Sequence, residues 1–270
     1  MKDDHAAFTG SIPEYYDRVL VPLIFAPCAD ELVARIKQTR PSRILELACG
    51  TGAVTTRLSQ TLGPSAKITA TDLNTAMLEV ARSKSASENC VAWRQADAGA
   101  LPFEPGSFDT VACQFGWMFF PDKARAMREA RRVLVPHGRL FYNTWDRIEH
   151  CPVYEETNDA VRALFPEDPP RFYEVPFSFY NEGENRQLMS DGGFSDISVE
   201  IRSSEGERMT AQAMAEGIVR GSPVVPEIEA RKGDVAAVVA SIAKRLADRF
   251  GAEPFASPMK AVFCSATAPS

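Results

Sequence analysis

Three short segments carry glycines and carboxylates at a spacing that could hold a ligand. The first is the run Glu46–Gly52, ELACGTG, in which two glycines follow an apolar stretch. Glycines directly after a strand permit a tight turn and let ligand atoms approach the backbone closely. Asp72, which lies 22 residues beyond Gly50, and Asp97 each close a later strand-like run. A single Gly-x-Gly is weak evidence, but a glycine loop followed by two acids is far more specific.

Each acid has a chemical interpretation and a plain structural one. Asp72 could accept hydrogen bonds from both hydroxyls of a ribose, or it could only cap the helix that follows. Asp97 could meet the amino group of an adenine, or it could only form a turn. The combination with the glycine loop favours ligand binding for both.

The glycine loop also separates two classes of nucleotide cofactor. A dinucleotide requires Gly-x-Gly-x-x-Gly, because its pyrophosphate lies on the helix N-terminus and the third glycine permits close helix packing. Thr55 stands at that third position, and Glu46 directs a carboxylate towards the site. A carboxylate repels a pyrophosphate but attracts the sulfonium and ammonium groups of S-adenosylmethionine. The charges therefore favour S-adenosylmethionine, and an NAD-dependent oxidoreductase is the less favoured alternative.

Alternating strands and helices must position these segments. Apolar runs predict strands at 44–49, 67–71, 90–95, 108–115 and 139–145, and helical periodicity is found at 53–61, 76–83 and 123–134. Pro136-His137-Gly138 is expected to end the last of these helices. Strands that alternate with helices imply crossover units and a parallel sheet.

The flanking segments complete the predicted fold. Residues 15–37 predict two helical pieces broken at Pro22 and Pro27. Further helices are predicted at 153–164, at 184–192 and over 207–250 with an interruption near 221–226, and strands at 197–201 and 259–266. We expect an α/β fold with a Rossmann-like, doubly wound, seven-stranded and mostly parallel sheet, helices on both faces and helical cap insertions.

Four segments together resemble the class I S-adenosylmethionine-dependent methyltransferases. They are ILELACGTGAVTTRL, ITATDLNTAML, WRQADAGALPFEPGSFDTVACQFGWMFFPD and REARRVLVPHGRLFYNTW. They are most similar to the small-molecule branch that includes the ubiquinone/menaquinone-biosynthesis methyltransferases, and the resemblance covers roughly residues 12–145 well. It implies one methyltransferase domain over 1–270, with N-terminal helices (1–40) closing over the cofactor, a cofactor-binding core (41–145) and substrate-cap elements (146–195 and 205–255).

The resemblance also implies which residues meet S-adenosylmethionine. Glu46, Ala48, Gly50 and Gly52 would line the methionine moiety, and Asp72 would hold the ribose. Leu73 and Met77 would lie against the adenine, and Asp97 with Ala98 would bind its edge. Gln114 and Phe115 would lie beneath the sulfonium, and Tyr16 would close over the cofactor. Ala48 departs from the family, which usually has glycine there, and its methyl group narrows the approach to the backbone. Leu73 and Met77 fit core positions equally well, Gln114 fits a strand end, and Tyr16 fits simple packing.

The residues that would act on a methyl acceptor are less defined. The catalytic residues are unknown, and His150, five residues past the strand at 139–145, is a weak candidate for a general base. A histidine in a surface loop is the commoner interpretation. Aromatic side chains gather near the expected pocket and suit a flat or apolar acceptor as well as an ordinary core: Trp117, Phe119, Phe120, Trp145, Phe172, Tyr173, Phe177, Phe179 and Tyr180.

Composition sets the remaining limits. The 270-residue chain has a net charge of −6, so no basic footprint for nucleic acid is expected. Six scattered cysteines and three dispersed histidines (His5, His137 and His150) predict neither a disulfide framework nor a metal site. The first residues lack a signal-peptide pattern, and no apolar run approaches the roughly 20 residues of a membrane span. These features predict a cytoplasmic protein without a membrane partner.

We therefore expect S-adenosylmethionine-dependent methyl transfer to O, N or C of a small-molecule acceptor. A methyltransferase-like protein that binds the cofactor without transferring methyl is the alternative from another class. The sequence sets neither the acceptor nor the oligomeric state.

Overall fold

The computed structural model describes residue 8, residues 10–84 and residues 90–270. His5, the amino-terminal residues considered for a signal peptide and the beginning of the predicted 1–40 segment lie outside the described residues.

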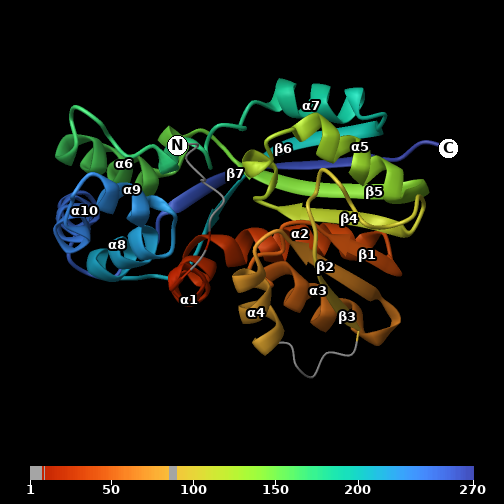
Figure 1. Ribbon diagram of the computed structural model, residues 1–270, viewed down its shortest axis with the longest axis horizontal. Helices are drawn as coiled ribbons and strands as arrows, with labels where there is room; N and C mark the ends of the chain where they lie inside the picture. The colour runs from red at the N-terminus through yellow and green to blue at the C-terminus, as the bar shows by residue number, and fades with distance from the viewer. Residues whose placement is uncertain (1–7, 9, 85–89) are drawn as a thin grey trace.

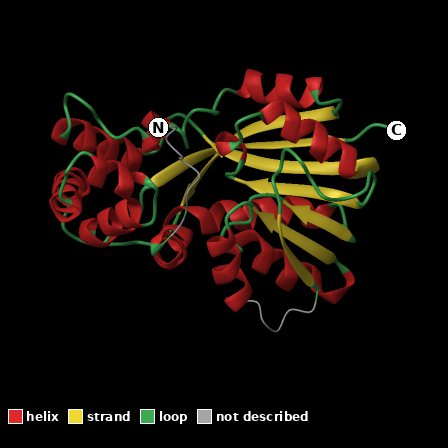
Figure 2. Cartoon of the chain, viewed as in Figure 1, coloured by secondary structure: helices red, strands yellow, loops and turns green. Residues whose placement is uncertain are grey.

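In the part of the chain that the structure describes, seven strands form one sheet with the order β3-β2-β1-β4-β5-β7-β6 (Figures 1 and 2). The strands are β1 (Arg43–Glu46), β2 (Lys67–Asp72), β3 (Val91–Gln95), β4 (Phe108–Gln114), β5 (Leu134–Trp145), β6 (Ser195–Glu205) and β7 (Pro258–Thr267). Strands β1 to β5 pair in parallel, and β7 is antiparallel to both β5 and β6. The predicted mostly parallel sheet, with the strand at 197–201 on its edge, is confirmed.

Helices cover both faces of this sheet. Helix α2 (Ala26–Gln38) packs on α3 (Ala53–Leu62), and α5 (Lys123–Val133) packs on α7 (Glu182–Asp191). Figure 1 shows these two pairs on opposite sides of the sheet, and α4 (Thr75–Lys84) lies beside β2 and β3. The apolar stripe predicted for α5 faces the core, because Ala126, Met127, Ala130 and Val133 are buried.

A second group of helices lies at one end of the sheet, on the left in Figure 1. It contains α6 (Pro152–Leu164), α8 (Ala211–Arg220), α9 (Val224–Ala230) and α10 (Val235–Phe250). Helix α10 packs against both α6 and α8. The predicted interruption between 221 and 226 is confirmed in part, because α8 ends at Arg220 and α9 begins at Val224.

The amino-terminal segment differs from its prediction. Helix α1 (Ile12–Tyr15), the π-helix η1 (Tyr16–Phe25) and α2 follow one another without a break, and Pro22 lies inside η1. Proline removes only one backbone donor there, and the wider π-helical turn leaves its ring room beside the preceding carbonyls. Pro27 stands in the first turn of α2, where its missing N–H has no helical partner to lose. The prediction of breaks at both prolines was wrong.

The end of α5 also differs. The helix ends at Val133, and β5 begins at the next residue, so Pro136-His137-Gly138 lies within the strand rather than ending the helix. His137 has a φ of 63°, and the register between β4 and β5 shifts there. The proline and glycine therefore mark an irregularity within a strand. Such irregularities, like turns, accommodate proline and residues with positive φ.

Candidate active site

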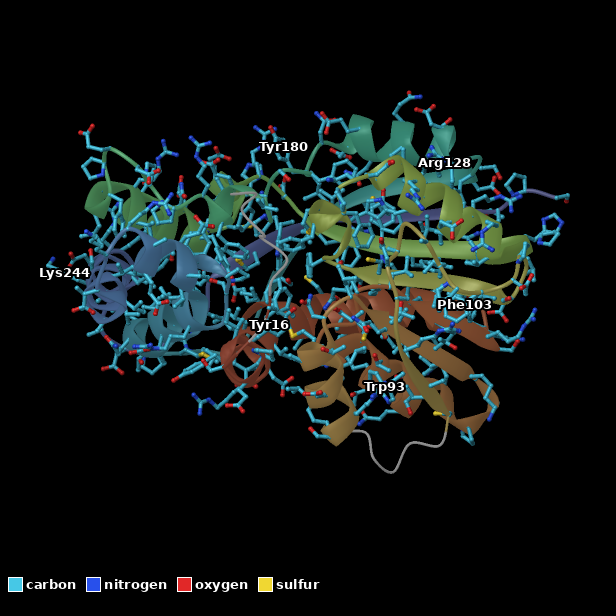
Figure 3. All side chains as sticks on the ribbon, viewed as in Figure 1. Tyr16, Trp93, Phe103, Arg128, Tyr180 and Lys244 are labelled. Atoms are coloured by element: carbon cyan, nitrogen blue, oxygen red, sulfur yellow. The ribbon has the colours of Figure 1, made fainter. Side chains whose placement is uncertain are left out.

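A cavity of about 390 Å³ opens at the carboxyl ends of β1, β2 and β4. Open parallel sheets bind ligands at this edge, where successive strands deliver their following loops to one place. The predicted cofactor residues that line it are Tyr16, Ala48, Gly50, Asp72, Leu73, Met77, Asp97, Ala98, Gln114 and Phe115. Figure 3 shows Tyr16 near the place where the end group of helices meets the sheet.

Asp72 lies at the centre of this arrangement. One carboxylate oxygen accepts a hydrogen bond from the backbone N–H of Gly50 (2.8 Å), and the other accepts one from Asn74 (2.8 Å). Burial raises the pKa of Asp72, and these backbone N–H groups oppose that shift. The Asn74 side chain and the backbone N–H of Leu73 also interact with this carboxylate, so the surrounding loop holds it in a fixed orientation at the cavity wall.

The glycine loop places its backbone close to the cavity. Gly50 has a φ of 56° and Ala48 a φ of 50°, both in the left-handed region that an L side chain rarely adopts. A Cβ built on Gly116 would lie 2.6 Å from the Cβ of Ala48 and 2.7 Å from the Sγ of Cys113. The methyl group of Ala48, where the resembled family usually has glycine, is therefore accommodated by a glycine across the cavity floor.

Glu46 and Gly52 do not line the cavity. The carboxyl group of Glu46 is buried and accepts a hydrogen bond from the Thr55 hydroxyl (2.6 Å). Burial raises its pKa to about 8, and the charge of Asp72 adds to the effect. Gly52 begins α3, and a Cβ there would lie 3.1 Å from the Trp93 ring and 3.2 Å from the Cβ of Ala81. Gly52 thus permits the close packing of a helix against its neighbours, and Glu46 lies under the loop.

The part of the cavity wall that contains Leu73, Met77, Asp97 and Ala98 combines apolar and polar side chains. Leu73 is 56% exposed although it lines the cavity, so it is not a core residue, whereas Met77 is buried as well as lining the cavity. Asp97 accepts a hydrogen bond from the backbone N–H of Gly99 (2.8 Å), and it lines the cavity together with Ala98. An exposed leucine beside a buried methionine provides the apolar surface that a flat ring needs.

The strand-end residues Gln114 and Phe115 hold the inner wall. Gln114 donates to the backbone carbonyl of Phe25 (3.3 Å). Phe115 has a φ of 52°, and its ring stacks on Trp145 with 3.7 Å between ring centroids. Gln114 is thus a cavity residue and also a link to the amino-terminal helices.

Some lining residues were not assigned to the cofactor site from sequence: Phe8, Thr71, Asn74, Ala96, Gly116, Phe119, Phe120, Pro121 and Val175. Asn74, Ala96 and Gly116 directly adjoin assigned segments, so their position in the chain is a usable signal. Phe8 and Val175 carry none, because only the tertiary fold brings them to this edge.

A second, smaller cavity of about 50 Å³ adjoins the first. The two share four residues, Phe8, Tyr16, Phe115 and Phe119. Of the aromatic residues expected near a pocket, Phe119, Phe120, Trp145 and Phe172 line one or both cavities. The others belong to neither lining, and they are Trp117, Tyr173, Phe177, Phe179 and Tyr180.

His150 lines neither cavity. Its ring nitrogen Nδ1 lies 2.5 Å from the Asp146 carboxylate, in the short helical turn after β5. The structure therefore does not bring this candidate base to the site. Within the described ranges, no cluster of three metal-ligating side chains occurs. None of the helices described has both the length and the apolar character needed to span a membrane.

Comparison with known proteins agrees with this geometry. Residues 45–142 match a protein family that is described as a methyltransferase domain. Over 127 residues the chain is 37% identical to the ubiquinone/menaquinone biosynthesis C-methyltransferase of Cronobacter sakazakii, covering 46% of this chain and about half (49%) of that relative. Over 176 residues it is 31% identical to the demethylmenaquinone methyltransferase of Staphylococcus aureus, covering 61% of this chain and 72% of that protein.

A solved structure shares the fold. It is a phosphoethanolamine N-methyltransferase of Haemonchus contortus in complex with S-adenosyl-L-methionine, with a TM-score of 0.57 and 19% identity, covering 97% of this chain and 61% of that one. The residues that line the larger cavity suit the same cofactor, because the carboxylates of Asp72 and Asp97 lie in one lining with the apolar side chains of Leu73 and Met77. The chain belongs to the class I S-adenosylmethionine-dependent methyltransferases, in the family that includes the demethylmenaquinone methyltransferases.

Proposed function

We propose that the protein transfers the methyl group of S-adenosylmethionine to a small-molecule acceptor. The observation that carries the proposal is the carboxylate of Asp72, which is fixed by the N–H groups of Gly50 and Asn74 and faces the larger cavity. When bound, the cofactor supplies an electrophilic methyl group on a sulfonium. The aromatic cavity that adjoins this one supports the assignment of the acceptor site.

The roles proposed for the residues follow from their positions. Asp72 would hold the ribose, Leu73 and Met77 would cover the adenine, and Asp97 with Ala98 would bind its polar edge. Gln114 and Phe115 would form the wall beneath the sulfonium, with Ala48 and Gly50 along the methionine moiety. Tyr16, between the two cavities, would close over the cofactor. We place Glu46 and Gly52 in support of the loop, because neither lines the cavity.

Catalysis in this proposal rests mainly on proximity and orientation. Holding two reactants in a near-attack geometry removes much of the entropic part of the barrier. The buried rings around the smaller cavity exclude water from the acceptor, and no proton-transfer residue is required for an acceptor that is already nucleophilic.

The wider organisation follows the same proposal. The described part of 1–40 would act as a closing segment, 41–145 as the cofactor-binding core, and 146–195 with 205–255 as acceptor caps. All six cysteines are free, which supports a reducing, cytoplasmic location. The net charge of −6 supports a small molecule rather than nucleic acid as partner.

Thermal unfolding with added ligands tests the cofactor assignment. At a concentration about 100 times its Kd, S-adenosylmethionine should stabilise the protein by about 2.7 kcal/mol, which raises Tm by about 5–10 °C for a chain of this size. Asp72→Asn should weaken this binding about 10- to 100-fold, because charge-assisted hydrogen bonds to hydroxyl groups are lost.

Two controls complete the test. Asp191→Asn, at the end of α7 and outside both cavities, should bind the cofactor as the unmodified chain does. Protection by NADH without protection by S-adenosylmethionine would overturn the proposal. Cofactor binding without labelled methyl reaching any acceptor would favour the alternative of a binding protein that does not transfer methyl.

A further inference from the structure

The smaller cavity, called here the aromatic chamber, has an unusual chemical lining. It is formed by Phe8, Tyr16, Leu20, Phe25, Phe115, Phe119, Trp145, Tyr154, Phe172, Pro176, Gly221 and Ser222. No carboxylate, imidazole, ammonium, guanidinium or thiol belongs to this lining among the described residues. The chamber therefore offers aromatic surface and three hydroxyl groups, and it contains no general base.

Two of the hydroxyls are unused by the protein. Ser222 donates its hydroxyl to the carbonyl of Ile218 (2.8 Å). The hydroxyls of Tyr154 and Tyr16 make no hydrogen bond within the part of the chain that the structure describes. Tyr154 is only 6% exposed, and it lines the chamber. A hydroxyl in a mostly apolar wall gains from a ligand that hydrogen-bonds to it.

Neither tyrosine can serve as a base near neutral pH. Burial raises the pKa of Tyr154 well above its usual range, with smaller contributions from Tyr173, Tyr16 and Cys151. Burial also raises the pKa of Tyr16, with contributions from Asp72, Asp17 and Cys49. Both hydroxyls stay protonated, and each phenol oxygen remains free to accept a hydrogen bond.

A chamber without a base restricts the acceptor. An alcohol, a phenol or a carbon acid must lose a proton before or during attack, and nothing in this lining can remove it. A neutral amine needs no prior proton loss, because its lone pair is already nucleophilic. Its methylation also moves one positive charge from sulfur to nitrogen without creating a second charge, and aromatic faces stabilise such a cation.

We propose that the aromatic chamber takes a small amine, with Tyr16 and Tyr154 as the residues that position its nitrogen. This rests on the proposed function. The nitrogen lone pair forms the N–C bond as the C–S bond breaks, and the electron pair of that bond stays on sulfur. The nitrogen becomes an ammonium ion. Before transfer, the two N–H groups of a primary amine can donate to both phenol oxygens, and the single N–H of a secondary amine to one of them. After transfer, the ammonium product of either amine loses one proton to water.

The cap supplies part of the lining that would select the amine. Tyr154 lies on α6, Phe172 and Pro176 lie in the segment after it, and Gly221 with Ser222 lies between α8 and α9. All of these residues fall outside the matched methyltransferase segment 45–142. The family match therefore places no constraint on these residues of the chamber.

Binding measured without turnover is the first arm of the test. In the presence of S-adenosylhomocysteine, calorimetry should show that choline binds about 3- to 30-fold more tightly than its uncharged isostere 3,3-dimethylbutan-1-ol, because only the cation gains from the aromatic faces. Phe172→Leu should reduce this preference, and Tyr173→Phe should keep it, since Tyr173 is buried but outside the chamber. Equal binding of the two probes overturns the proposal.

Methyl transfer to four ring compounds of similar size is the second arm. Piperidine and morpholine should be methylated, and phenol and cyclohexanol should not. The apparent pKa of kcat/KM should move with the pKa of the amine used, whereas an enzyme base, or the titration of Glu46, would give one value for both amines. Methyl transfer to phenol alone would overturn the proposal of an amine acceptor but not the proposed methyl transfer. Failure to bind S-adenosylmethionine would overturn the proposed function instead.

Tyr154→Phe separates positioning from packing. It should raise KM for piperidine about 3- to 10-fold, the value of one hydrogen bond, with little change in kcat. N-Methylpiperidine has no N–H, so its KM should stay unchanged in the same variant. An equal rise in KM for both amines would show that the Tyr154 hydroxyl has no positioning role.

Discussion

Glu46 lies under the glycine loop, where the fold sets its protonation state. Its carboxyl group is 1% exposed and bonded to Thr55, and burial raises its pKa from an ordinary value of 4.5 to about 8. A carboxyl group with a raised pKa binds its proton more tightly in the folded state than in the unfolded one. A cation in the adjoining cavity would favour the ionised form, so cofactor binding below about pH 8 should release a proton.

The pH dependence of stability tests this residue. Because the pKa is raised on folding, the favourable contribution is complete below about pH 4.5, declines as the pH rises, and is lost above about pH 8. Glu46→Gln cannot titrate, so its Tm relative to the unmodified chain should rise between pH 5 and pH 8 and then level off. A constant difference across this range would contradict the pKa shift.

Gly116 and Ala48 form a second residue-scale pair. Gly116→Ala places a methyl group 2.6 Å from the Cβ of Ala48 and 2.7 Å from the Sγ of Cys113, so we expect a loss of about 1–3 kcal/mol. Ala48→Gly removes one of these contacts and also the left-handed strain of an alanine at φ 50°. In urea unfolding, the double variant should therefore lose less stability than the two single effects predict together. Strictly additive effects would show that the two residues do not interact.

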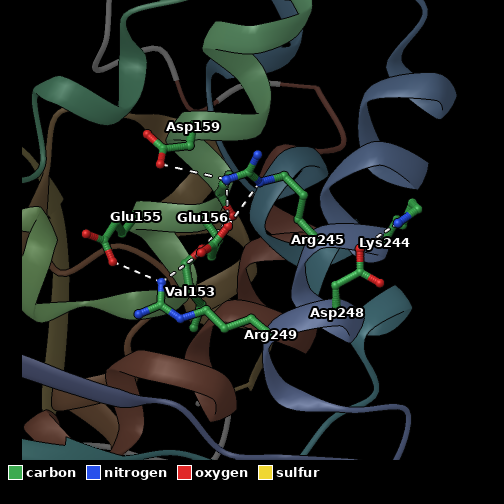
Figure 4. Close-up of polar contacts among 9 residues, drawn as sticks. Val153, Glu155, Glu156, Asp159, Lys244, Arg245, Asp248 and Arg249 are labelled. Carbon is green, nitrogen blue, oxygen red and sulfur yellow. Dashed lines mark hydrogen bonds and ion pairs between the residues drawn. The ribbon is translucent and has the colours of Figure 1, made fainter.

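At the scale of elements, charged side chains join α6 to α10 (Figure 4). Glu156 accepts from Arg245 (3.0 Å) and from Arg249 (2.8 Å), and Arg249 also binds Glu155 (3.0 Å). The Glu156 side chain is only 17% exposed, so its ion pairs are less screened than those of a fully solvated pair. This network fastens the helix that carries Tyr154 to its neighbour in the cap.

Glu156→Gln should destabilise the cap because it removes the shared partner of two arginines. We expect a loss of about 1 kcal/mol at low salt, or about 2–4 °C in Tm, with a smaller loss at high salt. Asp248→Asn is the matched control, since its pair with Lys244 lies on the same helix α10 but is well exposed. Equal effects of the two substitutions would show that burial gives the Glu156 network no advantage.

At the scale of the whole molecule, the site lies where two bodies of secondary structure meet. The sheet edge supplies Asp72 and Phe115, the amino-terminal helices supply Tyr16, and the end group of helices supplies Tyr154. The two cavities share Phe8, Tyr16, Phe115 and Phe119 in their linings, so they adjoin at these rings. Residues from the amino-terminal helices, the sheet edge and the end group of helices therefore meet at this place.

The sequence by itself determined the sheet, the order of its alternating elements and most of the cofactor cavity. Strand periodicity, the loop around Gly50 and the two acids are local patterns, and parallel strands necessarily bring their carboxyl ends to one edge. The break expected at Pro22 was wrong because a helix can widen around a proline, which no local propensity states. The helix predicted at 123–134 ends at Val133, close to its expected end, but Pro136 lies inside β5 because that strand begins directly after the helix and takes up 135–138 as an irregularity in its pairing with β4.

Only the tertiary structure decided where isolated side chains lie. Glu46 and Gly52 belong to the same motif as Gly50, yet packing places them behind the cavity wall, and His150 lies outside both cavities beside Asp146. Tyr154 and Phe8 line the aromatic chamber although they lie far apart in the sequence, with no pattern that links them. Contacts between distant segments depend on how helices pack onto the sheet, and residue spacing along the chain does not contain that information.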